Sequence, residues 1–226
     1  MFTPDTSISD FVPFSSHVSP SVVKTREGDY LVSWHLEGLP FVGREEWELE
    51  HRHNTSNRLL QTLRAPDFVN VAFWVHDVRR RRRVNVKSSF RHRFNQEMSD
   101  AYYTALSTQK MMQNDLYMTM IYRPVVGGKR FMEKTADHIK IKAEEEQSIT
   151  KLQELAGNVE AVIKDYSPYR LGMYEGANGI VFSETLEFLG YILNRLEEPV
   201  PVLHSPIYNY LPVSRHMFSS KSGDFV

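Results

Sequence analysis

The stretch Asp29-Tyr-Leu-Val-Ser-Trp-His-Leu-Glu37 alternates between polar and apolar residues with a period of two. Successive side chains of a β-strand point to opposite faces, so this pattern predicts a half-buried strand. Its apolar face comprises Tyr30, Val32, Trp34 and Leu36. Two more segments predict strands. Residues 68–78 are apolar on both faces, which indicates a central strand covered on both sides, and residues 116–122 end at Arg123-Pro124.

Helical periodicity describes most of the chain between these strands. It predicts helices over residues 44–64, 88–108 and 133–165, with Ser88 capping the second, and a fourth helix that Ser183 caps. The strongest apolar stripe, typical of a core helix, comprises Ile149, Leu152, Leu155, Ala156, Val159, Val162 and Ile163. Before the fourth helix, residues 169–182 predict a hairpin that turns at Gly176-Ala-Asn-Gly179.

Strands that alternate with helices, together with a hairpin that needs antiparallel pairing, indicate an α+β fold. We expect a mostly antiparallel sheet packed against helices, and two ferredoxin-like halves are one way to arrange it. Residues 1–27 are rich in Ser, Pro and Thr and predict an extended leader. The α+β domain then covers residues 28–213, either as one unit or as two halves at about 28–125 and 126–213, and residues 214–226 follow it as a separate C-terminal segment.

The composition is that of an ordinary globular protein. The 226 residues are 41% hydrophobic and carry a formal net charge of −1, so no global field attracts nucleic acid or membrane. The absence of cysteine excludes disulfides and thiolate metal sites. The N-terminus lacks the pattern of a signal peptide, and no run approaches the roughly 20 apolar residues of a membrane span. We therefore expect a soluble cytosolic protein whose membrane contact is peripheral.

Motifs for catalysis, cofactors and metals are absent from the sequence. The nearest approach to a phosphate-binding loop is Val126-Gly-Gly-Lys-Arg130, which lacks the first glycine and the Ser or Thr and therefore predicts a turn. Nine histidines include no His-Glu-x-x-His, and no Gly-x-Ser-x-Gly elbow occurs. We expect no catalytic, cofactor-binding or metal-binding residue in this chain.

The sharpest local signal is a run of five arginines, and it comprises Arg79, Arg80, Arg81, Arg82 and Arg83. One interpretation is a solvated strand end whose alternate arginines pair with carboxylates of the helix at 133–146. The others are docking to anionic lipid headgroups or to an acidic protein partner. The nucleic-acid backbone ranks third, because the run lacks the interleaved aromatic residues of single-strand binders.

Four segments of the sequence, by their order and spacing, resemble the N-terminal region of the CagE/TrbE/VirB family, the ATPases of bacterial type IV secretion systems. They are Asn114-Asp-Leu-Tyr-Met-Thr-Met-Ile-Tyr-Arg-Pro124, Tyr166-Ser-Pro-Tyr-Arg-Leu-Gly-Met-Tyr-Glu175, Ser183-Glu-Thr-Leu-Glu-Phe-Leu-Gly190 and Tyr210-Leu-Pro-Val-Ser-Arg215. Asp29-Tyr30 matches as well. The resemblance covers residues 24–215, and the Walker motifs of the family's ATPase domain are missing from the sequence.

The resemblance implies a non-catalytic assembly and membrane-docking domain on the cytoplasmic face of the bacterial inner membrane. The parent enzyme would bind ATP and Mg²⁺ in a following domain and would energise pilus assembly, conjugation or export of protein or DNA. Its partners would be other type IV secretion subunits, including inner-membrane components, its own ATPase domain and anionic lipid. The full-length protein would form a homo-oligomer.

Two alternatives remain open at this point. Residues 214–226 are either a flexible tail or the start of the ATPase domain, and we expect a chain cut at that boundary rather than a split gene. The alternative function is an independent anion- or nucleic-acid-binding α+β protein that uses Arg79–Arg83.

We predict that this chain neither binds nor hydrolyses ATP measurably. Without a phosphate-binding loop, no preformed nest of backbone amides holds the triphosphate. Titration calorimetry of the 226-residue chain with MgATP should give no heat of binding. An affinity in the micromolar range would contradict the prediction.

Overall fold

The computed structural model describes residues 8–38, 43–82, 88–109, 111–124 and 138–212. The strands are β1 Phe14–Ser19, β2 Val22–Thr25, β3 Tyr30–Leu36, β4 Val71–Arg82, β5 Met111–Tyr122, β6 Pro168–Arg170, β7 Met173–Glu175 and β8 Val181–Ser183. The α-helices are α1 Glu46–Thr62, α2 Arg93–Ser107, α3 His138–Val162, α4 Glu184–Asn194 and α5 Ile207–Tyr210. Short 3-10 turns lie at Ile8–Asp10, Pro66–Phe68 and Lys164–Tyr166.

Six strands form one antiparallel sheet in the order β1-β2-β3-β5-β4, and β6 also pairs with β3. Strands β7 and β8 form a separate hairpin. The α+β class with a mostly antiparallel sheet is therefore confirmed. The arrangement as two ferredoxin-like halves is wrong, because β6 from residues 126–213 hydrogen-bonds to β3 from residues 28–125. The two segments build a single sheet.

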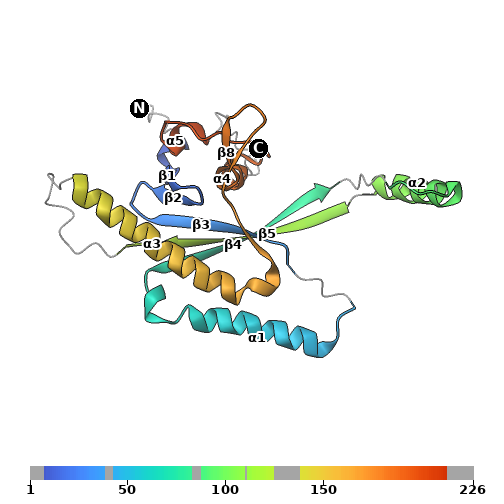
Figure 1. Cartoon of the computed structure of the whole chain (residues 1–226), viewed down its shortest axis with the longest axis horizontal. Helices are drawn as coiled ribbons and strands as arrows, with labels where there is room; N and C mark the ends of the chain where they lie inside the picture. The colour runs from blue at the N-terminus through green and yellow to red at the C-terminus, as the bar shows by residue number, and fades with distance from the viewer. Residues whose placement is uncertain (1–7, 39–42, 83–87, 110, 125–137, 213–226) are drawn as a thin grey trace, which may run out of the picture.

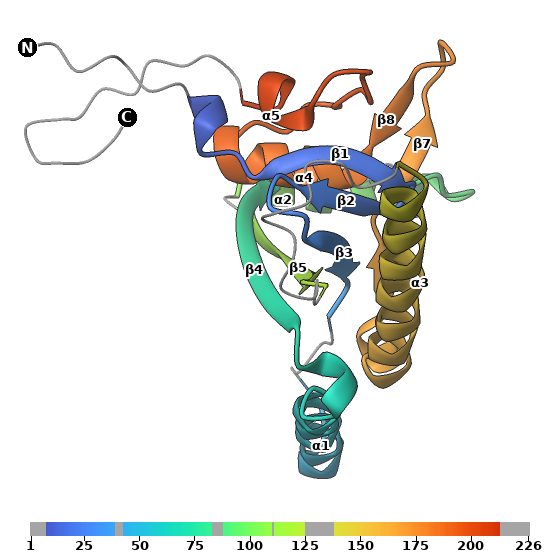
Figure 2. The same ribbon diagram turned by 90° about the vertical axis from the view of Figure 1, so that its left-hand side faces the viewer.

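The sheet has a hydrophobic core on each face. On one face, Trp34 of β3 and Met120 of β5 pack with Leu152, Leu155 and Val159 of α3, while α1 contributes apolar residues at its C-terminal end. On the other face, β2 and β3 pack against α4 and α5, and the buried residues include Val23, Leu31, Leu186, Leu189 and Ile207. Helices α4 and α5 lie above the sheet and α1 below it in Figures 1 and 2. The predicted core stripe of residues 149–163 is confirmed at Leu152, Leu155, Ala156, Val159 and Ile163.

The expected leader over residues 1–27 is wrong for the part that forms β1 and β2. These strands pair with each other across a turn at Pro20-Ser21, and β2 pairs with β3. Most of their few apolar residues are buried: Phe14, Val22 and Val23 are 6%, 1% and 0% exposed. Short apolar pairs within a Ser-rich segment carry too little periodicity to be recognised as strands, whereas an open edge of β3 pairs with them readily.

The roles of β3 and β4 are the reverse of those that the patterns predict. Strand β3 is covered on both faces, and on its polar face the buried Ser33 and Thr119 hydroxyls satisfy each other by a hydrogen bond of 2.8 Å. Strand β4, which looks central in sequence, is an edge strand that leaves Trp74 46% and Val75 64% exposed. The burial of each strand depends on the elements that pack beside it. The polar and apolar pattern of a single strand does not reveal which elements those are.

The predicted hairpin is right in its turn and wrong in its first strand. Strands β7 and β8 pair antiparallel on either side of Gly176–Gly179, as expected. The preceding residues 168–170 leave the hairpin and pair with β3 as β6. Leu171 is buried, whereas Tyr169 is 54% exposed and its hydroxyl donates a hydrogen bond to Glu184 at 2.9 Å.

Leu155→Asp should unfold the domain or lower its stability by about 3–5 kcal/mol. The substitution removes a fully buried apolar side chain between α3 and the sheet and places a carboxylate in the same core. Gln153→Asp, on the exposed side of the same helix, is the matched control and should melt close to the parent. Circular dichroism melts of both variants test this, and similar curves would show that the stripe is not core.

His17 of β1 connects the N-terminal strands to α4. Its Nδ1 donates to the Ser19 carbonyl at 3.3 Å, and its Nε2 accepts from the Ser183 hydroxyl at 2.9 Å. The same hydroxyl accepts from the Leu186 N–H at 3.2 Å and so caps α4, as the sequence predicts. Burial disfavours the imidazolium and lowers the pKa of His17 below its ordinary value of 6.5.

The His17 pair predicts a pH dependence of stability. Because the folded-state pKa lies below the unfolded value, the unfolded chain binds more protons as the pH falls through about 6.5, and the folding free energy weakens. Above that pH the contribution is complete. Urea unfolding at pH 7.5 and pH 5.5 should show a larger loss for the parent than for His17→Gln. Equal losses of unfolding free energy in the two proteins would show that His17 does not contribute to the destabilisation at low pH.

Candidate docking arm

Strands β4 and β5 extend beyond the rest of the sheet. Their twelve-residue ladder runs from Val71↔Tyr122 to Arg82↔Met111, whereas the pairing of β5 with β3 stops at Leu36↔Leu116. The pairs beyond that point form a two-stranded ribbon that projects from the body and leads to α2 at its far end (Figure 1). We call residues 78–115 the arm.

Helix α2 occupies the end of the arm and contains no buried residue. It begins at Arg93 rather than at the predicted cap Ser88, because Gln96 fixes the preceding turn. The Gln96 side chain accepts from the Phe90 N–H at 2.9 Å and donates to the Ser88 carbonyl at 3.0 Å. The predicted helical spacing is confirmed, yet its large side chains face solvent: Phe94 is 72% exposed, Met98 61% and Tyr102 60%. The apolar spacing by itself does not reveal that this surface is uncovered.

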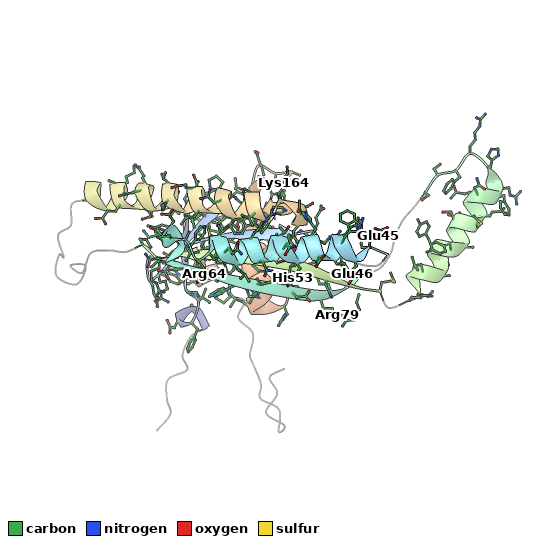
Figure 3. The ribbon with its side chains drawn as sticks, turned by 90° about the horizontal axis from the view of Figure 1, so that it is seen from below. Glu45, Glu46, His53, Arg64, Arg79 and Lys164 are labelled. Carbon is green, nitrogen blue, oxygen red and sulfur yellow. The ribbon has the colours of Figure 1, made fainter. Side chains whose placement is uncertain are left out.

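The arginine run lies where the ribbon leaves the body. Arg79, Arg80, Arg81 and Arg82 are the last residues of β4, and Arg83 lies outside the described residues. Arg79 is exposed and has no ion-pair partner among the residues that the structure describes (Figure 3). Arg80 is different, since only 14% of its side chain is exposed. The structure therefore separates one internal arginine from at least one that is free to meet a partner.

Arg80 anchors the arm to the body. Its Nε lies 3.2 Å from Oδ2 of Asp115, its Nη1 reaches the Glu197 carboxylate, and its guanidinium stacks 4.4 Å from the centre of the Tyr191 ring. Asp115 is 4% exposed and faces Val78 across the ladder. The prediction that the arginines pair with carboxylates of the helix at 133–146 is thus wrong for Arg80. Its acidic partners come from β5 and from the segment after α4.

A cleft of about 480 Å³ opens beside Arg80 between the sheet and α4. Its walls combine aromatic rings with carboxylates, and the acidic residues are Asp115, Glu184, Glu187, Glu197 and Glu198. Nearby, Tyr174 donates to Glu187 at 2.7 Å, and this hydrogen bond raises the pKa of Tyr174 to about 12. The body is therefore acidic where the arm begins.

The arm and the body carry opposite charge. Residues 78–115 contain nine Lys or Arg and three Asp or Glu, a formal charge of +6, which leaves −7 for the rest of a chain of net −1. The near-neutral total hides this separation. A local field of this size attracts anionic surfaces to the arm and repels them from the body.

Arg80→Met should lower the unfolding free energy by about 2–3 kcal/mol. The change leaves the buried Asp115 carboxylate without its arginine. Arg79→Met keeps the same change of charge and should stay within about 0.5 kcal/mol of the parent, since Arg79 is exposed. Chemical unfolding measures both. If the two variants lose the same stability, Arg80 does not anchor the arm.

The chain is similar in sequence to several known type IV secretion system proteins. The type IV secretion system protein virB4 of Brucella suis biovar 1 is 34% identical over 214 residues, which cover 91% of this chain and 25% of the relative. The type IV secretion system protein PtlC of Bordetella pertussis is 26% identical over 217 residues, 92% of this chain and 26% of the relative. The virB4 protein of Bartonella henselae is 24% identical over 94% of this chain and 27% of its own length.

The chain therefore spans about a quarter of the length of these curated relatives. Residues 21–129 match the family described as the N-terminal domain of the type IV secretion system ATPase VirB4/TrbE. This range holds β2 to β5 and α2, and so includes the whole arm. The resemblance seen in the sequence is thus confirmed: residues 21–129 match the N-terminal domain of the VirB4/TrbE secretion ATPases, and the virB4 relative from Brucella suis aligns with 91% of this chain.

Proposed function

We propose that this domain is the non-catalytic assembly and membrane-docking part of a type IV secretion ATPase. In this proposal it attaches peripherally to the cytoplasmic face of the bacterial inner membrane through the arm. The docking residues are Arg79, Arg81, Arg82 and Arg83 of the run, while Arg80 anchors the arm to the body. The observation that carries the proposal is the charge of +6 on a projecting arm whose Arg79 is exposed.

The physical argument starts from the membrane. The cytoplasmic leaflet carries anionic lipids, and each basic residue near its surface contributes about 1 kcal/mol to binding. No helix in the described ranges is long and apolar enough to cross a bilayer. Attachment by charge then requires a cluster of cations that reaches the surface before the acidic body does. The projection of the arm beyond the sheet provides that separation.

The parent protein's activity belongs to the same proposal. ATP and Mg²⁺ bind outside this chain, in the ATPase domain of the parent, and that enzyme energises pilus assembly and export of protein or DNA. The domain contacts other type IV secretion subunits, including inner-membrane components, and the full-length protein forms a homo-oligomer. The names of the relatives support the secretion context.

We expect Arg79→Ser/Arg82→Ser/Arg83→Ser to weaken cosedimentation with phosphatidylserine–phosphatidylcholine vesicles by about a hundredfold at low salt. Three cations at about 1 kcal/mol each account for this magnitude. Binding of the parent should also fall between low and physiological ionic strength, because exposed charges are screened. Arg80 is left intact, so the fold should be unaffected.

The matched control removes the same charge from the body. Arg58, Arg64 and Lys164 are exposed and lie outside the arm, and Figure 3 labels Arg64 just after α1 and Lys164 just after α3. Their replacement by Ser should leave vesicle binding nearly unchanged. Equal losses in the two triple variants would mean that net charge alone drives binding, and salt-independent binding would refute charge-driven docking.

A further inference from the structure

Helix α2 presents an apolar face that the described part of the domain does not cover. On a helical projection Phe94, Met98, Ala101, Tyr102 and Ala105 share one side, because they recur at three- and four-residue intervals. Asp100 and Ser107 lie on the other side. The large residues of the apolar side are mostly exposed, and the helix makes no extensive contact with another described element. Figure 3 shows α2 far from the helices of the body.

The charges around α2 indicate what covers this face. Lys87, Arg91 and Arg93 precede or begin the helix, and Lys110 follows it. Arg91 and Arg93 are exposed. The acidic residues of the helix are Glu97, which pairs with Arg93 at 2.6 Å, and Asp100 on the polar side. An apolar face with exposed cations at its N-terminal end is complementary to a surface that is anionic outside and apolar beneath, which describes an anionic bilayer.

We propose that α2 is an interfacial helix, which lies in the headgroup layer of an anionic membrane with Phe94, Met98 and Tyr102 among the acyl chains. This inference rests on the proposed function and adds a second, apolar component to docking by charge. Fifteen residues make a helix about 22 Å long, shorter than the roughly 30 Å hydrocarbon core, so α2 lies in the membrane plane and does not span it.

Aromatic and methionine side chains suit this position. An aromatic ring with a hydroxyl, as in Tyr102, keeps its polar end in the headgroup layer while its apolar body is buried. Methionine is flexible and adapts to irregular apolar surroundings. The ribbon of β4 and β5 holds the helix away from the acidic body, which therefore stays clear of the anionic surface.

Site-specific labelling tests the orientation, because the chain has no cysteine of its own. Met98→Cys and Asp100→Cys, in the 226-residue chain, each carry an environment-sensitive fluorophore on opposite sides of α2. With phosphatidylserine–phosphatidylcholine vesicles, the Met98→Cys label should shift to shorter wavelength and be quenched by brominated lipid, while the Asp100→Cys label stays in water. Equal responses of the two labels, or none, would overturn the insertion of this face.

Paired variants separate the inference from the proposed function. Phe94→Ser/Met98→Ser should lower the vesicle partition coefficient by at least about tenfold at physiological salt, where charge alone is screened. The control Thr104→Ala/Ser107→Ala, on the polar side, should leave it unchanged. Both variants should melt with the parent, because α2 has no buried residue.

Each result has a defined meaning. If the arginine triple variant loses binding and Phe94→Ser/Met98→Ser does not, α2 is not inserted and docking by charge stands. If neither variant loses binding, both proposals fail. A Met98→Cys label that shifts with protein concentration in the absence of vesicles, together with dimers in sedimentation velocity, would assign the face to a second copy and overturn the membrane assignment.

Discussion

The pairing of β3 with β5 is the constraint on which the rest of the structure depends. Seven consecutive residue pairs join these strands, and the buried Ser33–Thr119 hydrogen bond allows their polar face to lie inside the protein. Arg123 closes the end of the ladder by donating to both carboxylate oxygens of Asp29, at 3.0 Å to Oδ1 and 2.8 Å to Oδ2. With both faces covered, α3 packs below and α4 above. The excess length of β5 over β3 then creates the arm, because those residues pair with β4 alone.

The residues on which the family resemblance rests are structural in this domain. Arg123 and Asp29 join β5 to the start of β3. Arg170 bonds Glu160 at 2.7 Å, and the same carboxylate accepts from the Trp34 indole at 2.5 Å, which connects β6, α3 and β3. Ser183 caps α4 and holds His17. Such residues provide hydrogen-bond partners for polar groups where helices and strands meet. This explains why the matching sequence segments contain no catalytic or binding motif.

The arm combines features that are costly for an isolated domain. A two-stranded ribbon has little core, and a helix without buried residues gains no packing energy. Where the arm joins the body, Arg80 offsets part of this missing packing energy by pairing with Asp115 and stacking on the Tyr191 ring. Beyond that anchor, cations and apolar side chains remain exposed, and this is where native proteins place surfaces that a partner or a membrane covers. Both the structure and the charge of the arm thus support the proposal that it is the contact region.

The sequence by itself determined the α+β class, the approximate position of every large helix and of the main strands, the core stripe of α3 and the cap at Ser183. These features follow from local periodicity and capping chemistry, which depend on near neighbours in the chain. It also identified the arginine run. Only the tertiary structure decided that β1 and β2 join the sheet, that β4 lies at its edge, that Arg80 is internal while Arg79 is exposed, and that the apolar face of α2 is uncovered. Each of these depends on which segments meet across long sequence distances, and an apolar pattern does not specify what will cover it.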